Sequence, residues 1–187
     1  PVVKHLRDMG ELPLRRRVTF FVGENGIGKS TLMEAIAVAM GFNPEGGTVN
    51  FNFSTEDSHS ELYRYLTVCR GVKHQKDGFF LRAESFYNVA TDIDRMDADS
   101  AGAMLRPPHV IDSYGGVSLH RQSHGESFLA LVESRFGGNG LYLLDEPEAA
   151  LSPSRLLRLI CNIDELVKKD SQFIISTHSP ILMAFPG

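Results

Sequence analysis

The stretch VTFFVGENGIGKSTLMEAIAVAM, residues 18–40, predicts three elements in succession. Residues 18–22 are β-branched or aromatic, a composition typical of a strand that is buried on both faces of a parallel sheet. Residues 23–30 read GENGIGKS and fit the pattern G-x-x-x-x-G-K-S/T. From Lys29 onward, apolar residues recur at helical spacing until Gly41. A strand, a glycine loop and a helix in this order are the context in which the pattern indicates a phosphate-binding loop.

The chemistry of this loop favours a triphosphate. Glycines at positions 23, 26 and 28 let successive backbone N–H groups turn inward around an anion, and the helix that follows adds its positive dipole end. We expect the Lys29 side chain to reach the β- and γ-phosphates of ATP and the Ser30 hydroxyl to ligate Mg²⁺. The alternative, a glycine-rich turn that binds nothing, is disfavoured by the strand before it and the helix after it. The residues expected to contact ATP here are Asn25, Gly26, Ile27, Gly28, Lys29, Ser30 and Thr31.

Length and composition predict one globular domain over residues 1–187. Of these residues 42% are hydrophobic and 22% are charged. The net charge of −4 argues against a surface that is basic throughout, although a local basic patch could still bind nucleic acid. No apolar run approaches the length of a membrane span, so a cytoplasmic protein is expected. Cys69 and Cys161 lack a CxxC pattern and are expected to be buried thiols in a reducing compartment. The chain starts at Pro1 and stops at Gly187, where a helix is under way, so we expect both termini to be trimmed.

Further elements follow from the spacing of apolar residues. Residues 62–69 suit a helix or a strand, and residues 97–108 are expected to form a mobile connection. Strands are predicted at residues 49–54, 79–83, 141–144 and 173–176. Helices are predicted at residues 86–96, 123–136 and 153–167.

Polar side chains follow three of these strands. Asp145 and Glu146 come directly after the apolar run at 141–144, His178 follows the strand at 173–176, and Glu84 follows the strand at 79–83. In open α/β sheets ligands bind beyond the carboxyl ends of the strands. We therefore expect these side chains to lie near the phosphate-binding loop.

With these motifs in order, the sequence resembles the ATP-binding cassette (ABC-type) ATPases over residues 18–180. Residues 23–30 match the family's Walker A motif, and residues 141–146 match Walker B. Ser-His-Gly-Glu at 123–126 is similar to the signature motif, nearer to the S-G-G-E form of the RecF and SMC branch than to the transporters' S-G-G-Q. Ala150-Leu151-Ser152 matches the D-loop. The resemblance is greatest to an uncharacterised bacterial group of predicted ABC-type or AAA-family ATPases.

The sequence departs from the family pattern at three positions. Glu84 stands where the Q-loop glutamine is usual, Ser152 replaces the D-loop aspartate, and His124 replaces a signature glycine. No aromatic residue that could stack on adenine is identifiable before the Walker A motif. The interval between Lys29 and Ser123 is too short for the long coiled-coil arms of SMC-type proteins.

The resemblance implies an α/β fold of the P-loop NTPase class. It comprises a central, mainly parallel sheet, an antiparallel β portion and a helical signature-motif portion. In this chain the core corresponds to residues 18–41, 79–84 and 141–184, and the helical signature-motif region corresponds to residues 85–137.

The resemblance also implies that two chains sandwich two ATP molecules in a homodimer and hydrolyse them with Mg²⁺. In each site the signature motif of one chain holds the γ-phosphate of the ATP bound to the other chain. The implied catalytic residues are Glu146, which polarises water, together with His178 and Lys29. The implied magnesium ligands are Ser30, Asp145 and Glu84. The implied signature contacts are Ser123, Gly125 and Glu126.

Alternatives remain open on the sequence alone. The protein could be a RecF-like genome-maintenance clamp that uses ATP as a switch and binds DNA, or, less in keeping with its motifs, the ATP-binding subunit of a transporter. His178 could be a strand-end histidine without a catalytic role. His120 and His124 are four residues apart, as two zinc ligands can be, but they lack a cysteine pair or glutamate partner.

Overall fold

The computed structural model describes residues 2–48, 60–72, 75–100, 110–114, 116, 118–121 and 123–186. The strands are β1 (Val18–Val22), β2 (Asp77–Arg82), β3 (Gly140–Asp145) and β4 (Gln172–Thr177). The α-helices are α1 (Val2–Met9), α2 (Lys29–Met40), α3 (Phe86–Ser100), α4 (His124–Arg135), α5 (Pro153–Lys168) and α6 (Pro180–Met183). Short 3₁₀ helices are η1 (Glu61–Tyr65), η2 (Val110–Tyr114), η3 (Leu119–Arg121) and η4 (Pro147–Ala149).

The four strands form one parallel sheet in the order β1-β4-β3-β2. Because all four run the same way, their carboxyl ends meet at one edge. The register aligns Val22 with Thr177, Ser176 with Asp145, and Asp145 with Arg82. That edge therefore carries the residues that follow each strand, as predicted from the sequence.

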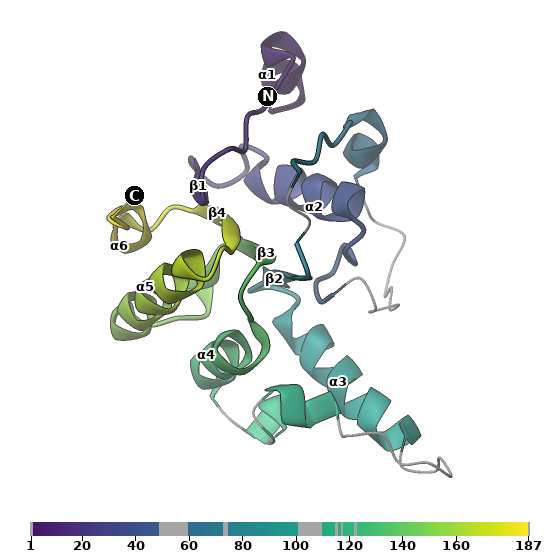
Figure 1. Cartoon of the computed structure of the whole chain (residues 1–187), viewed down its shortest axis with the longest axis vertical. Helices are drawn as coiled ribbons and strands as arrows, with labels where there is room; N and C mark the ends of the chain where they lie inside the picture. Colours follow the sequence, from purple (N-terminus) through teal and green to yellow (C-terminus); the bar gives the residue numbers. More distant parts are fainter. Residues whose placement is uncertain are drawn as a thin grey trace.

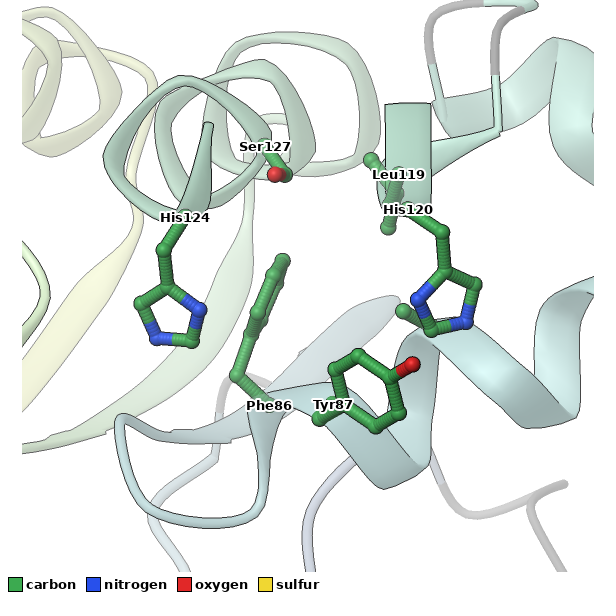
Figure 2. A pocket seen from close by; sticks show the side chains of 7 residues that line it. Phe86, Tyr87, Leu119, His120, His124 and Ser127 are labelled. Carbon is green, nitrogen blue, oxygen red and sulfur yellow. The ribbon is translucent and has the colours of Figure 1, made fainter. Parts of the chain in front are cut away.

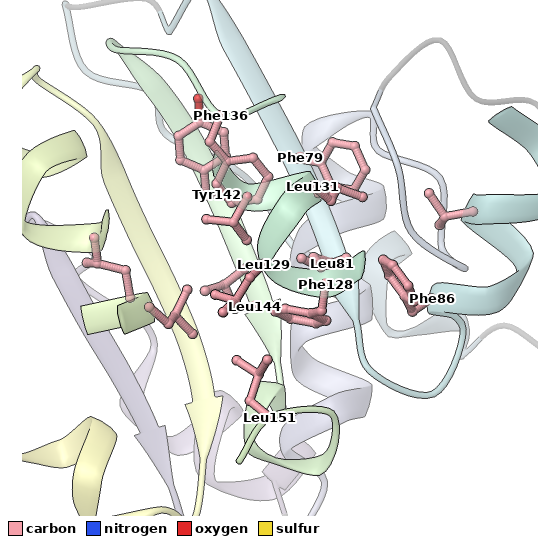
Figure 3. Packing of buried hydrophobic residues seen from close by; sticks show 14 of the residues in the cluster. Phe79, Leu81, Phe86, Phe128, Leu129, Leu131, Phe136, Tyr142, Leu144 and Leu151 are labelled. Atoms are coloured by element: carbon pink, nitrogen blue, oxygen red, sulfur yellow. The ribbon is translucent and has the colours of Figure 1, made fainter. Parts of the chain in front are cut away.

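Helices cover both faces of the sheet (Figure 1). Residues that alternate along each strand point to opposite sides, so the core divides into two clusters. In one cluster α2 packs on Phe80, Leu143 and Ile174. In the other, helices α3 to α6 cover the opposite face through a larger set of aromatic and aliphatic side chains (Figure 3). This second cluster includes Phe79, Leu81, Phe86, Phe128, Leu131, Tyr142, Leu144, Leu159 and Phe173. The layered α/β architecture with a parallel sheet agrees with the predicted P-loop NTPase class.

Several sequence predictions need correction. β1 forms as predicted, but it is not buried on both faces: its residues are partly exposed and Val22 is 55% exposed, because among the described strands β1 pairs only with β4. Helix α3 runs to Ser100 and so extends into the segment expected to be a connection. Cys69 and Cys161 are exposed, so the prediction of buried thiols is wrong. The predicted strand at 49–54 lies outside the described residues.

A polar network joins the amino end of the sheet to the end of α4. The Tyr142 hydroxyl donates to Asp77 Oδ2 at 2.8 Å, and Arg135 Nη1 donates to the same oxygen at 3.0 Å. Burial alone would raise the pKa of Asp77, but the hydrogen bond from Tyr142 and the charge of Arg135 outweigh it and lower the pKa. Ionised Asp77 therefore stabilises the fold above its unfolded-state pKa of about 4, and this contribution is lost as pH falls through the lower folded-state value.

We expect Asp77→Asn to lower the free energy of unfolding at pH 7 by about 1–3 kcal/mol, because Arg135 loses its charged partner. The variant should also lose less stability than the wild type when the pH falls below about 4. Urea unfolding of the two proteins at pH 7 and below pH 4 measures the difference in their free energies of unfolding. Asp164→Asn is the control, because Asp164 pairs with Lys168 on the exposed face of α5, where solvent screens the two charges, so its loss should lower the stability much less. Equal losses in the two variants at pH 7 would contradict the role of the network.

Candidate functional site

The loop between β1 and α2 has the backbone that its glycines predict. Gly26 and Gly28 have φ values of 79° and 105°, in the left-handed region that a residue with a Cβ rarely adopts. Gly28 is also the N-cap of α2, so the first turn of this helix faces the loop. Asn25 and Ile27 are exposed at the tip, and Thr31 is exposed on the first turn.

Lys29 is buried within this loop. Its side chain is 5% exposed, and Nζ donates to the carbonyl oxygens of Gly23 at 2.7 Å and Glu24 at 3.1 Å. Nζ also lies 3.4 Å from Glu146 Oε1. The lysine thus joins the glycine loop to the residue that follows β3, and a buried ammonium surrounded by oxygen atoms is suited to a phosphate neighbour.

Ser30 and Asp145 come together across the sheet edge. Ser30 Oγ donates to Asp145 Oδ1 at 3.2 Å, and Ser176 Oγ donates to the same oxygen. Asp145 is 5% exposed, and this burial raises the pKa of its carboxyl group, although Ser176, Arg82 and Ser30 partly oppose the shift. A buried carboxylate beside a hydroxyl is the kind of oxygen donor set that Mg²⁺ uses, and a divalent cation would favour the ionised carboxylate. Ser30 and Asp145 therefore fit the magnesium ligands inferred from the sequence.

Arg82 also borders this site, at the carboxyl end of β2. Its Nε lies 3.5 Å from Asp145 Oδ2, and its Nη1 donates to Glu34 Oε2 at 3.1 Å. Glu84 is the third magnesium ligand inferred from the sequence. Its side chain is 87% exposed, and its Oε2 atom lies 3.9 Å from Arg82 Nη2. The structure thus brings Ser30 and Asp145 into contact and places Glu84 beside Arg82.

Glu146 has a left-handed backbone, with φ 48° and ψ 54°, which is uncommon for a residue other than glycine. Its Oε1 atom lies between Lys29 Nζ at 3.4 Å and His178 Nδ1 at 4.0 Å. Such backbone strain often occurs at functional sites, where it aims a side chain that regular geometry would turn away. The structure thus brings together the three residues, Lys29, Glu146 and His178, for which the family resemblance implied catalytic roles.

The signature residues open helix α4. Ser123 is the N-cap, and Glu126 closes a capping box by accepting from the Ser123 hydroxyl at 2.6 Å and its backbone N–H at 3.1 Å. These two hydrogen bonds hold the pKa of Glu126 below its usual value. Glu126 also pairs with Arg155 of α5 at 3.0 Å. Its carboxylate is thus engaged within the chain, a role that the S-x-x-E spacing could have indicated.

Gly125 is buried where α4 meets the D-loop. A Cβ atom at this position would lie 2.8 Å from the Ala150 carbonyl oxygen and 2.7 Å from Arg155 Nη1. Side chains are therefore excluded here by the packing of the two segments.

A small cavity of about 80 Å³ lies beside the first turn of α4 (Figure 2). The His124 ring meets the edge of Phe86 at 5.3 Å between centroids, and the His120 ring meets Tyr87 at 4.4 Å. The two histidines thus pack on different aromatic rings at opposite sides of the cavity (Figure 2).

Sequence reasoning missed three residues that border the site. Ser176 binds Asp145, Arg82 faces it, and Glu148 binds the backbone and ring of His178. Ser176 and Arg82 lie at or next to the carboxyl ends of predicted strands, so their positions already indicated that they could border the site. For Glu148, two residues after Glu146, the sequence carries no comparable signal.

Comparisons with known proteins agree with this arrangement. A family described as "AAA domain" matches residues 4–95, and one described as "AAA domain, putative AbiEii toxin, Type IV TA system" matches residues 108–184. An uncharacterized ABC transporter ATP-binding protein of Haemophilus influenzae is 27% identical over 91% of this chain and 67% of its own length. The cytochrome c biogenesis ATP-binding export protein CcmA of Legionella pneumophila is 26% identical over 93% of this chain and 90% of its own. These similarities span both the glycine loop and the segment from β3 to β4.

Proposed function

We propose that this chain, which carries an ATPase domain of the ABC and AAA type, binds ATP with Mg²⁺ and hydrolyses it as a homodimer. The observation that supports this most is the meeting of Lys29, Ser30, Asp145 and Glu146 at one edge of the parallel sheet. A phosphate-binding loop, a pair of oxygen ligands and a second carboxylate within 3.4 Å of the lysine are the parts that phosphoryl transfer to water requires.

Each residue then has a defined task. The loop amides and Lys29 bind the phosphates and neutralise charge that develops on them during the reaction. Ser30 and Asp145 would hold Mg²⁺, which supplies further charge neutralisation when bound. Glu146 orients the attacking water and accepts its proton, and His178 contacts the γ-phosphate. Glu84 is proposed as a further ligand or water contact at the margin of the site.

The homodimer is proposed because the two phosphate-binding elements lie on opposite faces of the sheet. Lys29 opens α2, which packs on one face, whereas Ser123 opens α4, which packs on the other. Each chain would therefore build half of each site, and Ser123 with Gly125 would bind the γ-phosphate of ATP held by the partner. A nucleotide that binds the dimer alone favours association by about 2.7 kcal/mol at a hundredfold excess over its Kd.

Light scattering tests the homodimer. We expect Glu146→Gln to be mainly monomeric without nucleotide and dimeric with MgATP, because bound ATP persists and bridges the two chains. On the same background, Ser123→Arg should prevent dimerisation, because it places a bulky side chain at the contact. A double variant that dimerises as well as Glu146→Gln alone would overturn the sandwich arrangement while leaving ATP binding by each chain intact.

A second candidate is the ATP-binding subunit of a transporter. The observation that favours it is the match to CcmA, which covers 90% of that protein. Among the described helices none is long and apolar enough to cross a membrane. Fractionation of cells that express the chain separates the two candidates: a transporter subunit sediments with the membranes, whereas the homodimer alone stays in the cytoplasmic fraction.

A further inference from the structure

The Glu148 side chain contacts Thr177 and His178 at the carboxyl end of β4. It belongs to η4, directly after the strained Glu146, and is 9% exposed. Its Oε1 atom accepts from the Thr177 hydroxyl and from the His178 backbone N–H, both at 2.6 Å. The same oxygen lies 3.2 Å from His178 Nδ1. One carboxylate oxygen thus meets the backbone and the ring of a single histidine.

The other oxygen of Glu148 is also informative. Oε2 is buried, and within the part of the chain that the structure describes it has no hydrogen-bond partner. A buried carboxylate is costly unless it is paired, and the ring of His178 is the basic group that it meets. A neutral oxygen would be enough to hold this segment, because it can accept from the Thr177 hydroxyl and the His178 backbone N–H as a carboxylate does. The negative charge of Glu148 therefore suggests a further role.

Glu146 is less well placed than Glu148 to hold this ring. Its Oε1 lies 4.0 Å from His178 Nδ1, beyond hydrogen-bond range, and is closer to Lys29 Nζ. The two carboxylates therefore have different partners. Glu148 contacts the ring of His178, and Glu146 contacts Lys29.

We propose that Glu148 is a positioning residue that fixes His178 by accepting a hydrogen bond from Nδ1–H, so that Nε2 is the nitrogen free to meet the γ-phosphate. This rests on the role of His178 in the proposed function. The hydrogen bond made by one ring nitrogen determines which tautomer and orientation the ring adopts. Carboxylates that orient a histidine in this way contribute about 10–100-fold to affinity or activity at metal sites, and we expect a comparable effect here.

Steady-state ATPase kinetics test the proposal with Glu148→Gln, which keeps a neutral oxygen for the Thr177 hydroxyl and the His178 backbone N–H and, by removing the charge, weakens the hydrogen bond that Nδ1–H donates. We expect kcat to fall about 10–100-fold, with ATP affinity and melting temperature unchanged. Glu165→Gln, an exposed glutamate on α5, is the matched control and should retain full turnover. The double variant with His178→Ala should be no slower than His178→Ala alone, because Glu148 acts through that ring. Effects that multiply in the double variant, or a Glu148→Gln variant with normal kcat, would overturn the proposal.

Nuclear magnetic resonance of the histidine ring nitrogens tests it without turnover. We expect His178 in the wild type to be protonated at Nδ1 when neutral, and Glu148→Ala to shift it toward the Nε2–H form. Thr177→Val removes one donor to Glu148 but keeps the carboxylate, so it should retain the wild-type tautomer. The same tautomer in all three proteins would refute the orientation by Glu148. If the wild type failed to bind or hydrolyse ATP, the proposed function would fall, and this measurement would still decide the role of Glu148.

Discussion

Glu146→Gln is expected to bind MgATP normally and to hydrolyse it about 10²–10⁴-fold more slowly than the wild type, the usual cost of a lost general base. The glutamine occupies nearly the same volume, so the contact with Lys29 at 3.4 Å is replaced by a neutral one and the loop keeps its shape. What is lost is the carboxylate that can accept a proton from water. Phosphate release under saturating MgATP and calorimetric binding of MgATP measure the two properties separately.

The comparison variant for this experiment is Glu165→Gln on the exposed face of α5, which should hydrolyse ATP at the wild-type rate. Normal turnover in Glu146→Gln would place the base elsewhere, and Glu84 would be the first residue to examine, because it too follows a strand at this edge. Loss of both binding and turnover would instead indicate that the left-handed backbone at position 146 requires the acidic side chain.

Lys29→Ala should abolish ATP binding and turnover together. The lysine is the only basic side chain of the GENGIGKS segment, and its ammonium group is buried among three oxygen atoms. Without it the phosphates meet Glu146 and Asp145 with no intervening cation from the loop, and like charges in a poorly hydrated site repel strongly. Calorimetry with MgATP should therefore detect no binding at concentrations that saturate the wild type.

Lys168→Ala controls for the loss of a positive charge, because this lysine pairs with Asp164 on the surface of α5 and should bind ATP as the wild type does. The Lys29→Ala variant must also remain folded, which circular dichroism checks. Binding retained within a few fold in a folded Lys29→Ala protein would remove the central support for a phosphate-binding loop.

Sequence patterns predicted the four described strands and the helices between them because apolar residues cluster in each segment and glycine, proline or polar residues separate the segments. The runs at 141–144 and 173–176 are continuous and apolar, as strands with two covered faces are, and both are central in the sheet. A similar apolar composition led to the wrong prediction that β1 is buried on both faces. Composition does not show that this strand lies at the edge of the described sheet. The end of α3 was missed because its last residues are polar, and only their place in the structure shows that they continue the helix.

For the site, local motifs located the loop, the acid pair and the histidine, because each follows a strand. Contacts between segments were not predictable in the same way. The engagement of Glu126 by Arg155 and of His178 by Glu148 depends on side chains that are 29 and 30 residues apart and meet only in the folded chain. Contact between a nucleotide and the predicted site residues, Glu126 and Glu84 included, stays a prediction.

The strand order carries a consequence for how the chain is made. Of the described strands, β4 comes last along the chain, yet it lies between β1 and β3. During synthesis, the facing edges of β1 and β3 therefore have no partner until residues 172–177 have left the ribosome. Incompletely paired strands with apolar side chains are prone to aggregation, so we expect the nascent chain to be most prone to aggregation before β4 joins the sheet. The candidate site, which combines the loop and helix that follow β1 with residues at the ends of β3 and β4, is assembled only once β4 is in place.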